Sequence, residues 1–162
     1  MSLASSEPAQ VYLQLRNRIF SLNPTEVGLS PSDHARQVWG VIMETGYDVG
    51  FATLVSLADG TTSLYYSTGS GLIGSSIYSP LAEASKALVA EAENHLNQLH
   101  LTTVFTLPDI GEVRFYLLTY SGILTAEIGE IELSTGDHAL SPLYQRAQET
   151  LTQLRVFSEK KR

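Results

Sequence analysis

The sequence contains no cysteine, so disulfide bonds, thiolate nucleophiles and cysteine-ligated metals are all excluded. Its apolar runs are far shorter than the roughly 20 residues that a membrane-spanning helix needs, and we therefore expect no membrane insertion. The segment from Met1 to Pro8 contains neither a basic region nor an apolar run, unlike a secretory signal. These absences together predict a cytoplasmic protein.

Basic residues are scarce in the middle of the chain. The segment from Glu44 to Asp137 contains twelve acidic residues but only Lys86 and Arg114 as basic ones, a net charge of −10 within a total of −7. Phosphate binding needs clustered lysine and arginine, so this composition argues against a nucleic-acid partner. The basic residues at positions 160–162 are too few to indicate more than a solvated terminus.

The length and composition indicate one folded domain. The 162 residues are sufficient for a sizeable core, and 43% apolar with 17% charged residues is typical of a globular protein. We expect residues 1–9 to be disordered, residues 10–157 to form a single α+β domain, and residues 158–162 to be a basic tail.

Two runs rich in aromatic and β-branched residues lie on either side of Ser121-Gly122, between Glu112 and Ile128. A two-residue linker of this kind closes a β-hairpin. Apolar side chains alternate onto both faces of the two predicted strands, so both faces should be covered, as in the middle of a sheet. We therefore expect this hairpin at the centre of an antiparallel sheet.

Serine-proline pairs at positions 30–31, 79–80 and 141–142 predict helix starts, because serine caps helices and proline is tolerated at the first helical position. The apolar spacing of a further segment near the N-terminus predicts another helix, with Arg16 and Arg18 on its outer side. The expected helices are Val11–Leu22, Pro31–Thr45, which Gly46 would end, Pro80–Leu99 and Pro142–Phe157.

The remaining strands are predicted at Val49–Leu57 and Thr61–Ser67, which an Asp59-Gly60 turn joins, and at Leu101–Leu107. The segments Thr68–Ser79 and Gly129–Leu140 are expected to be loops. The fold class that follows is α+β, with a five-stranded, mostly antiparallel sheet and helices on both of its faces.

One glycine-rich segment matches a cofactor-binding pattern. Gly69-Ser-Gly-Leu-Ile-Gly74 has the spacing G-x-G-x-x-G of dinucleotide sites. In those sites the glycines open a helix directly after a parallel strand, whereas here the predicted helix starts five or six residues later. The segment therefore favours a flexible loop, and we expect no cofactor.

Histidines and acidic residues do not form a metal-binding or catalytic pattern. Glu91 and His95 have the spacing of an exposed pair on one face of a helix. Asp137-His138 shares an acidic segment with Glu130 and Glu132, but without the close, regular ligand spacing of a calcium loop. The G-x-S-x-G nucleophile motif is also missing from the sequence. We expect no metal site, no catalytic residue and no enzymatic activity.

The predicted element order resembles the Roadblock / dynein light chain family, which belongs with the profilin-like and longin-like α/β/α sandwiches. The resemblance covers roughly Ser30 to Leu154, and three segments carry it: Val49–Ser67 with its Asp-Gly turn, the long helix Leu81–Leu99, and Val113–Ile128. It implies a non-enzymatic, dimeric interaction module. Several members regulate small GTPases or serve as subunits of motor and signalling scaffolds, so a small GTPase is an implied partner.

Members of that family pair through the long middle helix and the adjoining edge strand. On this sequence the resemblance implies a homodimer interface formed by Ala87, Ala90 and Glu91 on the helix and by Leu101, Thr103 and Phe105 on the strand. The matching segments are Pro80–Leu99 and Leu101–Leu107.

A second hypothesis, from a different class, is a small-ligand sensor or minor enzyme. Its support is the glycine-rich loop beside several tyrosines, which would form a flexible lid over an aromatic-lined pocket. The residues of this alternative site are Tyr66, Gly69, Gly71, Gly74 and Tyr78.

Overall fold

The computed structural model describes residues 7–30, 37–74 and 77–160. The strands are β1 (Val38–Tyr47), β2 (Gly50–Leu57), β3 (Thr62–Tyr66), β4 (Gly71–Gly74), β5 (His100–Thr102), β6 (Glu112–Thr119) and β7 (Gly122–Gly129). The helices are α1 (Gln10–Phe20), α2 (Ser79–Ala92), α3 (Glu130–Ser134) and α4 (Ser141–Lys160), with 3₁₀ turns η2 (Pro24–Val27) and η4 (Glu93–Gln98).

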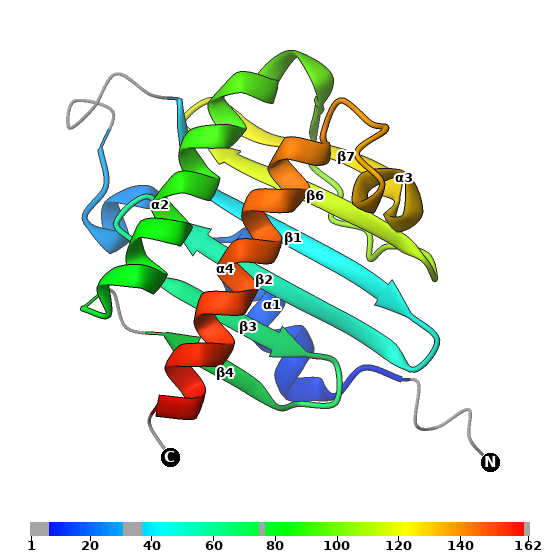
Figure 1. The fold of residues 1–162 in the computed structure, drawn as a ribbon, viewed down its shortest axis with the longest axis horizontal. Coiled ribbons are helices and arrows are strands. Elements are labelled where there is room, and N and C mark those ends of the chain that lie inside the picture. Colours follow the sequence, from blue (N-terminus) through cyan, green and yellow to red (C-terminus); the bar gives the residue numbers. More distant parts are fainter. Residues whose placement is uncertain (1–6, 31–36, 75–76, 161–162) are drawn as a thin grey trace.

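The strands form a single antiparallel sheet in the order β4-β3-β2-β1-β6-β7-β5. Helices α2 and α4 lie side by side on one face, which we call the front, and α1 lies behind the sheet (Figure 1). The expected α+β class is confirmed. The expected number of strands is wrong, because the sheet has seven strands rather than five.

The predicted central hairpin is present as β6 and β7, which pair in register from Glu112 with Gly129 to Thr119 with Gly122. This hairpin adjoins β1, and the three strands form the middle of the sheet. Side chains on both faces of these strands are buried in a core. The front core, under α2 and α4, includes Leu88, Phe115 and Leu154. The back core includes Ile42 and Tyr116.

Strand β1 replaces the helix expected at Pro31–Thr45, of which residues 31–36 lie outside the described part. Val41 and Met43 belong to the front core, whereas Ile42 points to the back. Because both faces of this strand are buried, its apolar residues are continuous, and a continuous run satisfies helical spacing as well as strand spacing. Gly46 therefore lies inside a strand and ends no helix, and a Cβ on it would collide with the Asp109 backbone.

Four further segments differ from expectation. Strand β4 forms inside the expected loop Thr68–Ser79, because its backbone pairs with β3 although its glycines disfavour a strand. Helix α3 occupies the start of the expected acidic loop Gly129–Leu140. Strand β5 has three residues instead of the seven of Leu101–Leu107, since the chain leaves the edge after Thr102. Within the expected basic tail, residues 158–160 are the last turn of α4.

A buried ion pair holds α1 on the back face. Arg16 donates from Nε to Glu44 Oε2 at 2.7 Å and from Nη2 to Glu44 Oε1 at 2.8 Å. The same carboxylate accepts a bond of 2.9 Å from Thr53, whose hydroxyl lies 2.7 Å from the Tyr12 hydroxyl. The outward position predicted for Arg16 is wrong, since Arg16 is 7% exposed and Glu44 is 0% exposed. The strand carboxylate supplies the partner that a buried guanidinium requires.

Two tyrosines beside this ion pair stay protonated well above neutral pH. Burial, and then the negative charge of Glu44, raise the pKa of Tyr12 to about 12. The same two causes raise the pKa of Tyr116 to about 12. Both phenols are therefore hydrogen-bond donors at neutral pH, and Tyr116 donates to the Thr106 carbonyl at 2.6 Å. This hydrogen bond holds Thr106, in the segment that follows β5, against the back face of the sheet.

Candidate functional site

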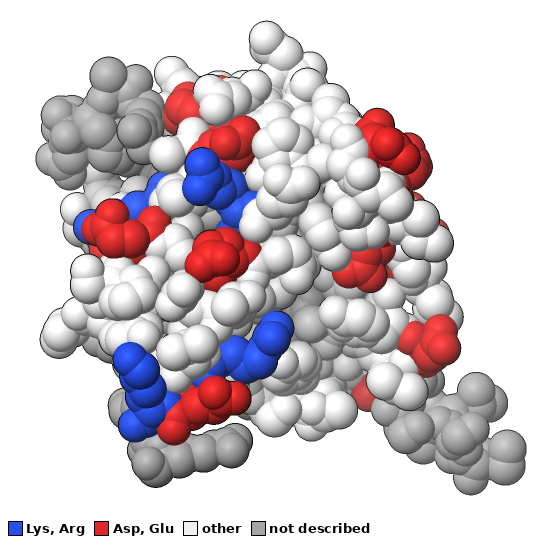
Figure 2. All heavy atoms as spheres, in the orientation of Figure 1, with Lys and Arg blue, Asp and Glu red and all other residues white. Residues whose placement is uncertain are grey.

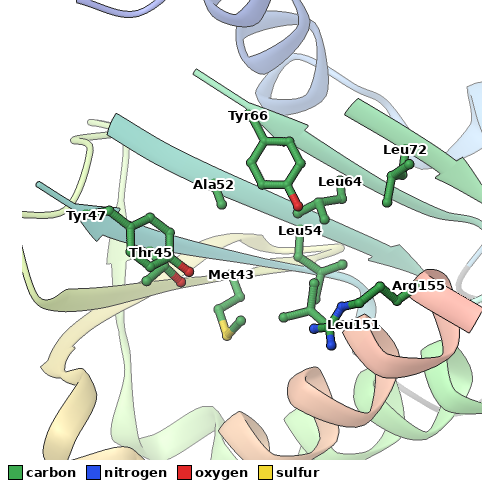
Figure 3. A pocket seen from close by; sticks show the side chains of 10 residues that line it. All are labelled: Met43, Thr45, Tyr47, Ala52, Leu54, Leu64, Tyr66, Leu72, Leu151 and Arg155. Carbon is green, nitrogen blue, oxygen red and sulfur yellow. The ribbon is translucent and has the colours of Figure 1, made fainter. Parts of the chain in front are cut away.

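A pocket of about 120 Å³ lies on the front face, between α4 and strands β1 to β4 (Figure 3). Its apolar lining consists of Met43, Ala52, Leu54, Leu64, Leu72 and Leu151, and its polar lining consists of Thr45, Tyr47, Tyr66 and Arg155. Most of its surface is therefore hydrocarbon, with a few polar groups, as is common in sites for small ligands.

The strand register explains why a hollow forms here. Met43 pairs with Leu54, Leu54 with Leu64, and Leu64 with Leu72, so one row of large apolar side chains crosses four strands. The next row reads Thr45, Ala52 and Tyr66. The small Ala52 between two larger neighbours leaves space that α4 roofs with Leu151 and, one helical turn later, Arg155.

The polar groups of the pocket lie around its apolar lining, with Thr45 and Tyr47 on one side and Arg155 on the other (Figure 3). The Thr45 and Tyr47 hydroxyls lie together, and the Tyr66 hydroxyl and the Arg155 guanidinium point into the same space (Figure 3). Burial and the negative charge of Glu130 raise the pKa of Tyr47, so its phenol is protonated at neutral pH. Among the described residues, the Arg155 guanidinium has no carboxylate within ion-pair distance.

Next to the pocket mouth, the tip of the β1–β2 hairpin carries an exposed apolar surface. Two shallow hollows share Tyr47 and Val49: one also includes Phe51 and Tyr66, and the other includes Ile110. We call these five residues the hairpin-end surface. Val49 is 75% exposed, Ile110 is 67% exposed and Tyr47 is 49% exposed. Asp48 and Glu130 line the second hollow.

The residues of the alternative ligand site are dispersed. Tyr66 lines the pocket, but Gly69, Gly71, Gly74 and Tyr78 are not among its lining residues. Tyr78 packs on Phe157, with ring centroids 5.3 Å apart, and under the Lys160 ammonium. Gly74 is buried against the side chains of Leu81 and Leu154. The glycine-rich segment is therefore partly an edge strand, and a lid over the pocket does not follow from it.

The predicted interface residues come from α2, from edge strand β5 and from the segment after β5. Ala87 and Ala90 are half-buried on the outer part of α2, and Leu101 is 65% exposed on edge strand β5. Thr103 is exposed. Phe105 stacks on Phe20 of α1 with centroids 4.4 Å apart, so it belongs to the back face rather than to the face of α2. Phe105 is therefore separated from the other predicted interface residues, and the remaining five stay a prediction.

The Glu91 and His95 pair is structural. Its expected exposure is wrong, because His95 is 6% exposed. The His95 ring lies 2.8 Å from Glu91 Oε2 through Nε2 and 2.6 Å from Gln98 Oε1 through Nδ1, which uses both nitrogens. In the acidic segment, Tyr144 donates to Glu130 at 2.7 Å. Within residues 7–30, 37–74 and 77–160, no three potential metal ligands gather.

Thr45, Tyr47 and Arg155 are absent from the site that the sequence predicts. The predicted helix Pro31–Thr45 hides the alternation by which Met43, Thr45 and Tyr47 share one face of strand β1. Arg155 follows Leu151 by four residues on α4, the spacing of neighbours on one helical face. That spacing is the signal that would have placed the guanidinium over the same strands.

Comparisons with protein-family models, curated proteins and solved structures find no match for this chain. In the described part of the chain, no helix has both the length and the apolar character needed to cross a membrane.

Proposed function

We propose that this protein is a non-catalytic protein-interaction module that binds a basic partner through the hairpin-end surface. One observation carries the proposal: an exposed apolar cluster stands inside an acidic part of the surface. Large apolar patches on a soluble protein commonly mark interaction sites, and a tyrosine beside aliphatic residues is a typical binding anchor.

The charges around the cluster select the partner. Asp48 and Glu130 line the hollow that contains Ile110, and Asp109 precedes Ile110 in the chain. The described residues that line the two hollows include no lysine or arginine. On the face shown in Figure 2, the side near the hairpin tip carries acidic side chains, whereas lysine and arginine lie toward the opposite side. Two copies of this surface would repel each other, so a basic protein surface is the better complement.

Replacing Val49 by aspartate is expected to weaken partner binding by about tenfold or more, because it adds charge to the apolar centre of the surface. Affinity capture from extract, with the wild-type chain and Val49→Asp side by side, measures this loss. The captured protein should be basic and should be released by raised salt, which screens exposed charges.

The matched control is Ile73→Asp on edge strand β4, where Ile73 is 71% exposed but lies outside the hairpin-end surface. Capture should survive this change. Equal capture by Val49→Asp and the wild-type chain would exclude the surface, and equal loss in both variants would indicate a non-specific effect. The resemblance to the Roadblock family makes a small GTPase a sensible protein to test with the same variants.

A homodimer is the second candidate, and the sheet edge supports it. Strand β5 pairs with β7 on one side only, and an unpaired edge offers backbone groups to another strand. Leu101 on this edge is 65% exposed, and Val104 just beyond it is 67% exposed. In such a dimer two β5 strands would pair across a two-fold axis, with the α2 helices on the same side.

Replacing Ala90 by arginine is expected to convert this dimer into a folded monomer. The substitution acts twice across a two-fold axis, and it brings like charges and excess volume into the contact. Sedimentation velocity at micromolar concentration measures the change. Gln145→Arg, at an exposed position of the neighbouring helix α4, is the control that should leave the dimer intact. A wild-type monomer of 17.7 kDa would rule out the dimer itself.

A further inference from the structure

We propose that the front-face pocket binds a small branched-chain monocarboxylic acid, with the hydrocarbon inside the pocket and the carboxylate on Arg155. The pocket would bind a small acid, whereas the hairpin-end surface would bind a basic protein. Tyr47 and Tyr66 line both. The inference does not depend on the proposed function. It rests on the size of the pocket, on its apolar floor and on the guanidinium at its rim.

The pocket size limits the hydrocarbon. A dry apolar cavity of about 150 Å³ accommodates benzene. A volume of about 120 Å³ is somewhat smaller and suits a branched chain of four or five carbons. The row of Met43, Leu54 and Leu64 has no polar side chain, so this part of the pocket favours an aliphatic group over a hydrogen-bonding one.

The rim supplies groups for an anion. Arg155 presents planar N–H donors that match the two oxygens of a carboxylate, and no carboxylate of the described chain pairs with it. The Tyr66 hydroxyl points toward the same space, and the protonated Tyr47 phenol lies beside Thr45 (Figure 3). A carboxylate attached to a short hydrocarbon satisfies both parts of the site.

Methyl-detected NMR titration of the full chain tests the site with 3-methylbutanoate as the probe. Shifts are expected for the methyl groups of Leu54, Leu64, Leu72 and Leu151, which line the pocket. The neutral analogue 3-methylbutanamide should bind about tenfold more weakly, because it cannot form the charged pair with Arg155. Acetate should bind more weakly still for lack of a hydrocarbon, and octanoate should be too long for the pocket.

Arg155→Gln should remove the preference for the acid over the amide and leave binding of the amide unchanged. Because Arg155 is exposed, this variant should fold normally. Arg146→Gln, an exposed arginine on the same helix, is the matched control and should bind like the wild-type chain.

Three results would overturn the proposal: no shifts at about 10 mM acid, shifts outside the pocket, or equal affinity for the acid and the amide. Stronger binding of octanoate would replace the short-chain ligand with a fatty acid. Arg155 and Arg146 line neither hollow of the hairpin-end surface, so these outcomes are independent of partner capture.

Discussion

Replacing Arg16 by alanine is expected to lower the free energy of unfolding by about 3–5 kcal/mol, because it leaves Glu44 buried without its countercharge. Glu44 is fully buried on β1, and two of its hydrogen bonds come from this guanidinium. Arg16 also donates to the Phe105 carbonyl at 2.8 Å, so its loss loosens the segment that crosses the back face. Chemical denaturation monitored by circular dichroism measures the difference.

Arg18→Ala is the matched control on the same helix. Arg18 is exposed, and its replacement should change the free energy of unfolding by less than about 0.5 kcal/mol. The paired change Arg16→Met with Glu44→Leu should recover most of the loss, because replacing both charges by apolar residues removes the unpaired carboxylate. Equal stability of Arg16→Ala and Arg18→Ala would mean that α1 does not pack on the sheet as described.

Replacing Leu88 by alanine should cost about 2–5 kcal/mol of unfolding free energy, since it removes a fully buried side chain and leaves a cavity between α2 and the sheet. Leu88 is 0% exposed and belongs to the front core. The melting temperature and the denaturant midpoint should both fall, and the cooperativity of unfolding should remain.

Lys86 lies two residues away on the exposed side of α2, and Lys86→Ala tests whether the helix itself is the sensitive element. This change should be nearly neutral, because alanine and lysine are both good helix formers. A similar loss in the two variants would contradict the orientation of α2, in which the Leu88 side faces the sheet.

Short sequence patterns predict the β6–β7 hairpin and the starts of helices α2 and α4. The β6–β7 hairpin follows from two β-rich runs around a two-residue turn, and helices α2 and α4 begin at their serine-proline pairs. Strand β1 could not be identified in this way, because its residues are apolar on both faces and read equally well as a helix. Its strand character depends on β2 and β6, which flank it in space.

The candidate site was predictable only through one residue. The sequence indicates Tyr66 by its place beside the glycine-rich segment, but the pocket depends on the register of four strands and on the position of α4. The burial of Arg16 could not be predicted from the sequence either. An arginine in a helix is expected in solvent, and here its partner is a buried carboxylate on another element. Both features arise from residues far apart in the sequence.

The central position of β1 also affects how the chain folds during its synthesis on the ribosome. Strand β1 meets β2 through a short hairpin, but its other neighbour is β6, where Val41 pairs with Leu117. Until that later segment emerges, one edge of β1 has no partner, and such edges invite association between nascent chains. Slower synthesis through the segment between β4 and β6 would therefore lengthen the period in which aggregation competes with closure of the sheet.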